Sequence, residues 1–190
     1  MHFNSRPKCA LLIVLSISLV ATGCSAQWIR VALADLPILG QMALNLGTLV
    51  TTLDSGKPLS TADTTAIQNI SAEAGKDLSL LQTLYNEYKT SPSDSTIQKI
   101  QNTITELDQN LPALLQAAHI SDPVLSAKVT AGVNLILTTV DSFAALIPQT
   151  AQPASAQTKR ATVEIPPAND LKKQWNEGVC GSVQVGCAVK

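Results

Sequence analysis

The stretch IQKIQNTITELDQNLPALLQAA, residues 97–118, decides the fold. Apolar residues recur in it at alternating intervals of three and four: Ile97, Ile100, Ile104, Leu107, Leu111, Leu114 and Ala118. This spacing places them on one side of an α-helix and is typical of the seam along which helices pack together. Because such a seam must be covered by other helices, the sequence predicts an all-α fold.

The residues around this seam predict where the helix begins and where it is interrupted. The segment Ser91-Pro92-Ser93-Asp94 precedes it. We expect a capping serine, a proline at the first helical position and an acidic residue in the first turn. Pro112 lies within the seam and should kink or split the helix, because proline lacks the N–H that the helix needs.

Three further stretches are predicted to be helices, residues 35–53, 60–89 and 122–147. Each begins at a residue whose side chain can cap a helix: Asp35, Ser60 and Asp122. Pro37 and Pro123 then suit a first turn. The last of the three stretches carries only Lys128 and Asp141 as charged residues, so we expect it to be the most buried helix of the four.

Residues 36–53 contain no charged residue, which allows two interpretations. A stretch of this length is close to the 20 or so residues that span a bilayer. Several polar residues, two glycines and a proline interrupt it, however, and favour a helix buried within a bundle. We therefore expect residues 35–147 to form an up-and-down antiparallel four-helix bundle, since short connections make neighbouring helices antiparallel.

The composition changes after the predicted bundle. Residues 148–169 are rich in Ala, Gln, Thr and Pro and are predicted to be a linker. Residues 170–190 are predicted to form a small tail, in which residues 171–177 make two helical turns and Trp175 docks on the bundle. Cys180 and Cys187 lie in this tail. A structural disulfide between them is the main hypothesis, and a redox pair or a metal site is the alternative.

The first 23 residues follow the pattern of an export signal. Arg6 and Lys8 form a positive region, and residues 10–20 are an apolar run. The following residues, Val20-Ala21-Thr22-Gly23-Cys24, resemble the lipobox of bacterial lipoproteins, although Ala21 stands where leucine is usual. The resemblance implies cleavage after Gly23, diacylglycerol on the Cys24 sulfur and acylation of the new amino group. The alternative is ordinary cleavage nearby, which would leave Cys24 unmodified.

The lipoprotein resemblance also implies a location. Ser25, rather than Asp, follows the modified cysteine and is similar to the signal for sorting to the outer membrane, facing the periplasm. Residues 24–34 are predicted to be the lipidated tether. Trp28 and Arg30 either rest on the membrane, where amphipathic rings are favoured, or belong to the first turns of the packed helix.

Charge and composition limit the possible functions. Without Arg6 and Lys8 the mature chain has 11 basic and 14 acidic residues, and aromatic residues make up 3% of the full chain. Nucleic-acid binding is therefore not expected, because it needs basic patches and stacking rings. His119, the single histidine of the mature chain, is expected in a turn, and Glu106 and Asp108 on different faces of a helix. We predict no catalytic residue, cofactor or metal.

Two binding functions stay open. The first is a structural or adaptor lipoprotein, tethered through Cys24, whose helices or C-terminal tail contact another envelope protein. The second is a carrier that holds an apolar ligand or lipid between its helices. A large apolar cavity would favour the carrier, and a filled core with an exposed apolar patch would favour the adaptor.

Overall fold

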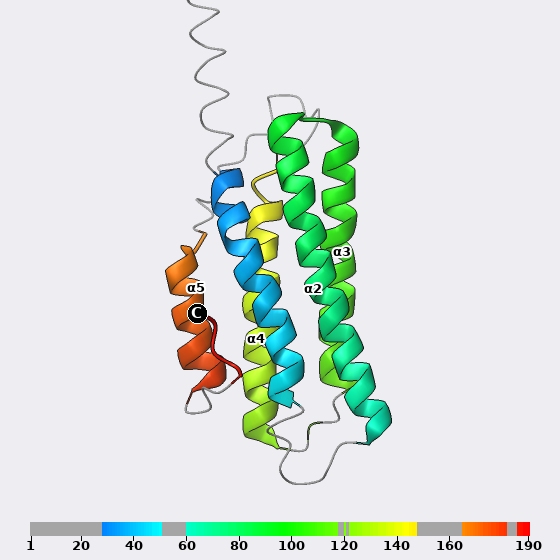
Figure 1. Cartoon of the computed structure of the whole chain (residues 1–190), viewed down its shortest axis with the longest axis vertical. Helices are drawn as coiled ribbons and strands as arrows, with labels where there is room; N and C mark the ends of the chain where they lie inside the picture. The colour runs from blue at the N-terminus through cyan, green and yellow to red at the C-terminus, as the bar shows by residue number, and fades with distance from the viewer. Residues whose placement is uncertain (1–27, 51–59, 118–119, 121, 148–164, 182–185) are drawn as a thin grey trace, which may run out of the picture.

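The computed structural model describes residues 28–50, 60–117, 120, 122–147, 165–181 and 186–190. Within these ranges the chain is helical and contains no strand, which confirms the predicted all-α class. The long helices lie side by side along a common direction: the N-terminal helix Trp28–Val50, α2 (Thr61–Thr90), α3 (Asp94–Ala117) and α4 (Pro123–Ala144) (Figure 1). A shorter element, α5 (Ala168–Gln174) continued by the π-helix η2 (Trp175–Cys180), lies at the edge of this group.

Helices α2 and α3 form a hairpin whose first helix begins as predicted. The Ser60 hydroxyl accepts a hydrogen bond from the Asp63 N–H at 3.1 Å and donates one to the Asp63 carboxylate at 2.7 Å. The first bond satisfies a backbone N–H that a helix start leaves without an intrahelical partner, and the second joins the two side chains. The two helices run in opposite directions and pack along their length (Figure 1).

The start of α3 corrects the prediction that Ser91 caps it. The cap is Ser93, whose carbonyl accepts from the Ile97 N–H at 3.1 Å and whose hydroxyl accepts from the Thr96 N–H at 3.2 Å. Pro92 therefore precedes the cap instead of occupying the first helical position. Proline disfavours helical backbone in the residue before it, so Ser91 ends α2 and the next helix begins three residues later, at Asp94.

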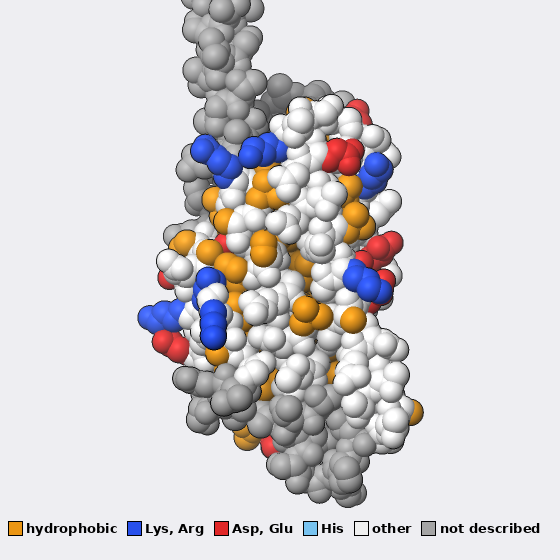
Figure 2. Space-filling model, in the orientation of Figure 1, with side chains coloured by type: hydrophobic (Ala, Val, Ile, Leu, Met, Phe, Trp, Pro, Cys, Tyr) orange, Lys and Arg blue, Asp and Glu red, His pale blue; other side chains and the backbone are white. Residues whose placement is uncertain are grey.

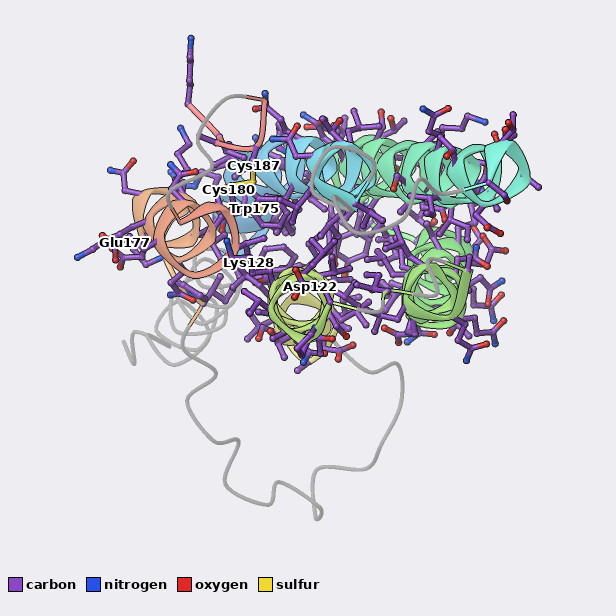
Figure 3. The ribbon with its side chains drawn as sticks, turned by 90° about the horizontal axis from the view of Figure 1, so that it is seen from below. Asp122, Lys128, Trp175, Glu177, Cys180 and Cys187 are labelled. Atoms are coloured by element: carbon purple, nitrogen blue, oxygen red, sulfur yellow. A yellow bond between two sulfur atoms is a disulfide. The ribbon has the colours of Figure 1, made fainter. Side chains whose placement is uncertain are left out.

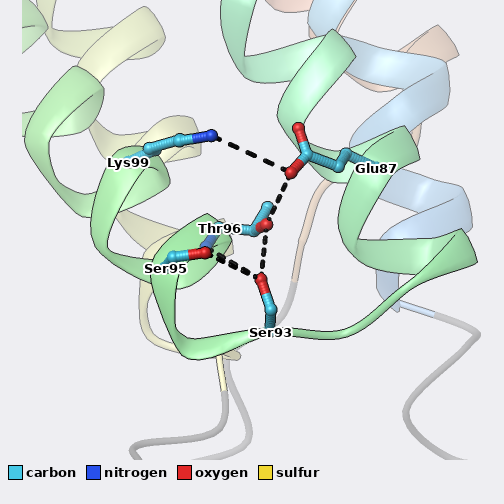
Figure 4. Close-up of polar contacts among 5 residues, drawn as sticks. All are labelled: Glu87, Ser93, Ser95, Thr96 and Lys99. Carbon is cyan, nitrogen blue, oxygen red and sulfur yellow. Dashed lines mark hydrogen bonds and ion pairs between the residues drawn. The ribbon is translucent and has the colours of Figure 1, made fainter.

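A polar network ties this hairpin turn together (Figure 4). The Thr96 hydroxyl donates to the Glu87 carboxylate across the two helices at 2.8 Å, and the Lys99 ammonium lies 4.0 Å from the same oxygen. Because Thr96 has a single hydroxyl proton, the 2.8 Å contact between Ser93 and Thr96 uses the proton of Ser93. The buried Thr96 is thus satisfied on both sides.

Helix α3 confirms the seam that decides the fold. Six of its seven predicted apolar positions are buried: Ile97, Ile100, Ile104, Leu107, Leu111 and Leu114. The seventh, Ala118, lies outside the described residues. Pro112 does not split α3, which continues to Ala117. The carbonyl that loses its partner belongs to Asp108, an exposed residue, so water can satisfy it.

The N-terminal helix corrects a second predicted start. It already includes Trp28, so Asp35 and Pro37 lie inside it and Asp35 is not its N-cap. Ile29 and Ala32 are buried, and the Trp28 ring packs edge-on against Tyr85 of α2 with 5.5 Å between centroids. This packing stabilises two additional turns. Residues 28–34 therefore form the first turns of the packed helix, which was one of the two interpretations of this segment.

Glycines allow the N-terminal helix to approach α2 closely. A Cβ on Gly47 would lie 2.8 Å from the Ser71 hydroxyl oxygen, and one on Gly75 would lie 3.2 Å from Leu44 Cδ2. The two contacts pair a later residue of one helix with an earlier residue of the other, which indicates that the helices are antiparallel. The predicted end of this helix at residue 53 and its connection to α2 fall within residues 51–59, which lie outside the described residues.

Helix α4 begins where it was predicted and ends earlier. The Asp122 carboxylate accepts from the Val124 N–H at 2.8 Å and the Leu125 N–H at 3.4 Å. The α-helix stops at Ala144, because the Leu146 and Ile147 N–H groups bond three residues back in tighter turns. It is not the most buried helix, because a larger share of the residues of the N-terminal helix is buried.

The N-terminal helix and α4 are both long and apolar enough to cross a membrane. This is weak evidence, because a core helix of a water-soluble protein has the same length and composition. Both helices contribute one face to a shared core with α2 and α3. Their apolar character is therefore explained by packing within the protein.

Candidate functional site: a disulfide-closed tail docked on the helices

The most elaborate local arrangement is at the C-terminus. Helix α5, η2 and residues 186–190, together called the docked tail, pack against α4 and the N-terminal helix. Trp175 points inward, whereas Glu177 points away from the bundle (Figure 3). The buried side chains of the docked tail are Leu171, Trp175, Val179, Cys180, Cys187 and Val189. The predicted helical turns around Trp175 are thus present, beginning at Ala168 and ending in a π-helix.

Trp175 is seated on a glycine of α4. Its side chain is fully buried. A Cβ on Gly132 would lie 2.8 Å from Leu46 Cδ2, closer than real Cβ atoms approach, and 3.0 Å from Trp175 Cζ3, closer than most of them do. The missing side chain therefore makes room for the indole. Burying an indole removes roughly 150–250 Å² of surface from water, which contributes about 4–6 kcal/mol before entropic losses.

Hydrogen bonds fix the end of the chain over this ring. The Cys187 carbonyl accepts from the Trp175 indole N–H and from the Asn45 side-chain amide, each at 2.8 Å. The Asn176 side chain bonds both the N–H and the carbonyl of Val189, at 2.9 and 3.1 Å. These bonds matter because buried backbone groups without partners are costly. They also join the chain end to the N-terminal helix through Asn45.

Cys180 and Cys187 form the predicted disulfide, with 5.7 Å between their Cα atoms. Both are buried, and each sulfur is bonded to the other. Neither is therefore free to bind a metal. No group of three or more His, Cys, Asp or Glu residues that could hold a metal occurs among the described residues. The arrangement closes the docked tail covalently where η2 ends.

Gly181 directs the chain out of η2. Its N–H donates to the Asn176 carbonyl at 2.9 Å, and its φ of 56° lies in the left-handed region that favours glycine. The Lys128 ammonium of α4 lies beside it, 3.5 Å from where a Cβ would stand. Figure 3 shows Lys128 next to the disulfide-bonded segment. The docked tail presents a polar outer face, because its exposed side chains are Asn169, Asp170, Lys173, Gln174, Glu177 and Lys190.

Asp35 is the second unusual feature of the described residues. Its side chain is fully buried in the apolar face of the N-terminal helix, and neither carboxylate oxygen has a hydrogen-bond partner. Burial raises the pKa of this carboxyl from 3.8 to about 6. The Tyr85 hydroxyl is also buried without a partner, and burial raises its pKa. Sequence analysis missed this site because aspartate before a proline is also typical of a helix start.

The remaining carboxyls with shifted pKa values do not converge. Burial raises the pKa of Asp77, with further increases from Glu106 and Glu73. Burial also raises the pKa of Asp108, with Asp141 of α4 adding to it. Glu106 therefore lies toward Asp77 of α2, and Asp108 lies toward Asp141 of α4. The two carboxyls are thus on different faces of α3, as predicted.

The predicted site residues are divided between the two ends of the chain. The structure brings Cys180 and Cys187 together, while Cys24 and His119 lie outside the described residues. The contributions of Asn45 and Gly132 were missed. Neither residue is distinctive in sequence, since a glycine or asparagine within an apolar helix has several explanations.

The comparisons with known proteins gave no relatives. A scan against protein-family models matched no family, and searches of curated proteins and of solved structures found no match.

We expect Gly132→Ala to displace Trp175. The added methyl should lower the free energy of unfolding by about 1–3 kcal/mol, less the gain of up to about 1 kcal/mol from replacing a helical glycine. Denaturant unfolding and the emission maximum of tryptophan measure both effects. Gly178→Ala is the matched control, because nothing lies within 4 Å of the added Cβ. Equal stabilities of the two variants would contradict the proposed seat.

We expect Asp35→Asn to change the pH dependence of stability. The folded pKa of about 6 exceeds the unfolded value of 3.8, so the stability from the neutral carboxyl is complete below pH 3.8 and is lost as pH rises through 6. The loss corresponds to about 3 kcal/mol. Unfolding free energies between pH 4 and 7 should therefore fall less in Asp35→Asn than in wild type. Glu177→Gln, at an exposed site, should keep the wild-type slope.

Proposed function

We propose that the protein is a cell-envelope lipoprotein, anchored to the outer membrane through Cys24, whose helical body is a non-enzymatic adaptor for another envelope protein. The supporting observation is the order of features at the N-terminus. The lipobox-like segment ends at Cys24, and Trp28, the first of the described residues and one that packs against Tyr85, follows four residues later. The acyl chains would thus attach next to the folded body without entering its core.

We further propose that the four long helices form an up-and-down bundle. Three observations support this arrangement. The colour gradient reverses its direction between successive long helices (Figure 1). The glycine contacts pair the N-terminal helix with α2 in antiparallel fashion. Contacts between α3 and α4 add the fourth helix to the hairpin.

The filled core disfavours a carrier, and the described residues do not form the exposed apolar patch that was expected of an adaptor. The largest side chains, Trp175, Tyr85 and Phe143, are fully buried, as are the leucines around them. A core occupied in this way favours a rigid body. Exposed large apolar side chains are scattered, at Leu44, Leu80 and Val124. We therefore assign partner recognition to the docked tail, whose outer face is polar and whose backbone is held by a disulfide.

A non-enzymatic role agrees with the chemistry of the described residues. Catalysis needs titratable groups that converge on one place. The carboxyls with raised pKa values, Asp35, Asp77 and Asp108, belong to three different helices, and burial is the main cause of each shift. The raised pKa values of these separate carboxyls are therefore attributed to packing and not to a shared site.

The anchor is tested by mass spectrometry of the mature protein purified from membranes. We expect wild type to begin at Cys24 with a mass increased by a diacylglycerol and an acyl chain. Cys24→Ser should abolish this modification and release the protein from membranes, because one residue carries all the acyl chains. Cys9→Ser should have no effect, since Cys9 belongs to the removed leader. An unmodified wild-type N-terminus would refute the lipoprotein assignment.

The adaptor role is tested by crosslinking in intact envelopes followed by affinity capture. We expect a partner protein to be recovered with crosslinks to the docked tail, and we expect Asn176→Ala to reduce the yield because it releases Val189. Ser95→Ala, at an exposed site on α3, is the control. Recovery of a bound lipid without a protein would instead support a carrier.

A further inference from the structure

One end of the helical body carries two aromatic rings and two basic side chains. Trp28 is half-buried against Tyr85, and Tyr88 follows one turn later on α2. Arg30 and Lys89 are exposed, and neither makes an ion pair with another described residue. Together, Trp28, Arg30, Tyr88 and Lys89 are called the anchored end. Basic side chains are visible at the corresponding end of the molecule in Figure 2.

The length of the tether limits where this end can lie. Trp28 lies four positions after Cys24, and a fully extended chain spans at most about 3.6 Å per residue, or about 14 Å. The polar layer of one leaflet is about 5–8 Å thick, since a bilayer of about 40–45 Å has a hydrocarbon core of about 30 Å. A lipidated Cys24 would therefore keep Trp28 at or next to the headgroups.

The chemistry of the anchored end fits such a surface. Tryptophan and tyrosine rings are favoured at headgroup depth, and arginine and lysine are attracted to anionic lipids. The exposed acids Glu87 and Asp94 lie at the same hairpin turn, and Lys99 lies 4.0 Å from the Glu87 carboxylate, so the rings supply the larger part of the attraction. The exposed stripe along the rest of the N-terminal helix has no charged residue and a single large apolar side chain, Leu44. It therefore offers a bilayer neither basic groups nor an apolar face, so contact along the side of the helix is less favourable than contact at its end.

We propose that the helical body stands upright on the bilayer, with the anchored end in contact with anionic headgroups and the disulfide-bonded segment pointing away. This inference rests on the proposed lipid anchor at Cys24. The N-terminal helix has 23 residues, which corresponds to about 35 Å at 1.5 Å per residue. Gly186 lies against Thr48, 20 residues beyond Trp28, and so about 30 Å further from the membrane. An upright body thus presents the end of the docked tail to a partner across the periplasm.

The two tryptophans of the chain provide the test, because they lie in different parts of the body. The lipidated protein is reconstituted into vesicles of phosphatidylglycerol and brominated phosphatidylcholine, whose bromine atoms quench tryptophan on contact. We expect loss of the fluorescence that Trp28 contributes and none of that from Trp175. Wild type is compared with Trp28→Phe, which keeps a ring against Tyr85 and leaves the buried Trp175 unchanged.

Quenching in wild type but not in Trp28→Phe supports the upright orientation. Because Trp175 is fully buried, contact of the docked tail is read from Glu177→Trp in the Trp28→Phe background, which places an exposed indole on the tail. Quenching of that indole means that the docked tail touches the bilayer, and no quenching in wild type means that the body is held away from it; each result overturns the proposal. If circular dichroism shows that Trp28→Phe does not fold, Trp28→Tyr replaces it. The double variant Arg30→Glu, Lys89→Glu should weaken the quenching in anionic vesicles. Lys128→Glu should not, because Lys128 lies near the start of α4 beside the docked tail, away from the anchored end.

A separate arm distinguishes failure of this inference from failure of the proposed anchor. Mature protein with a free Cys24 is coupled to a maleimide-bearing lipid in the same vesicles, since Cys180 and Cys187 are joined to each other. If native protein lacks the lipid but the coupled protein shows quenching of Trp28, the lipoprotein assignment fails and the orientation set by the short tether is retained. If the coupled protein shows no such quenching, the orientation fails whatever the native modification is.

Discussion

Burial of one apolar face along each long helix is the constraint on which the rest of the structure depends. The chain has few aromatic residues, so its core consists mainly of Leu, Ile and Val side chains that fill space only when helices approach closely. Gly47 and Gly75 allow this approach between the N-terminal helix and α2. Gly132 also allows close packing, because the space that a side chain would occupy there is filled by the ring of Trp175. The docked tail therefore contributes buried side chains to the core of the helical body.

Asp35 is an exception to this apolar face. A carboxyl without partners in a core layer costs stability when it ionises, and burial accordingly moves its pKa toward neutrality. The packing of Trp28, Ile29 and Ala32 on one side and of Leu36 and Leu39 on the other holds it in place. The end of the N-terminal helix that carries Asp35 is also the end that follows the proposed lipid anchor. The stability of this end is thus expected to respond to the pH of the surrounding solution.

The two ends of the chain have complementary structural roles. The N-terminal helix begins almost at the proposed site of lipid attachment, and the C-terminal residues return to the same helix through the bond from Asn45 to the Cys187 carbonyl. The disulfide and the two bonds of Asn176 keep that return fixed. A body constructed in this way would hold a polar, covalently closed segment at a constant distance from a membrane, which is the geometry that an adaptor requires.

The sequence by itself determined the helical class, the seam of α3, the starts of α2 and α4 and the pairing of Cys180 with Cys187. These features depend on local spacing, on caps formed within three residues, or on a single available pair of cysteines. Only the tertiary structure decided that Ser93 replaces Ser91 as a cap, that the N-terminal helix includes Trp28, and that Asp35 is buried. The last two outcomes depend on packing between segments distant in sequence, because contacts such as Trp28 with Tyr85 outweigh the local preference of aspartate for a helix start. The cap at Ser93 combines the local effect of Pro92 on Ser91 with the bond from Thr96 to Glu87 of the preceding helix.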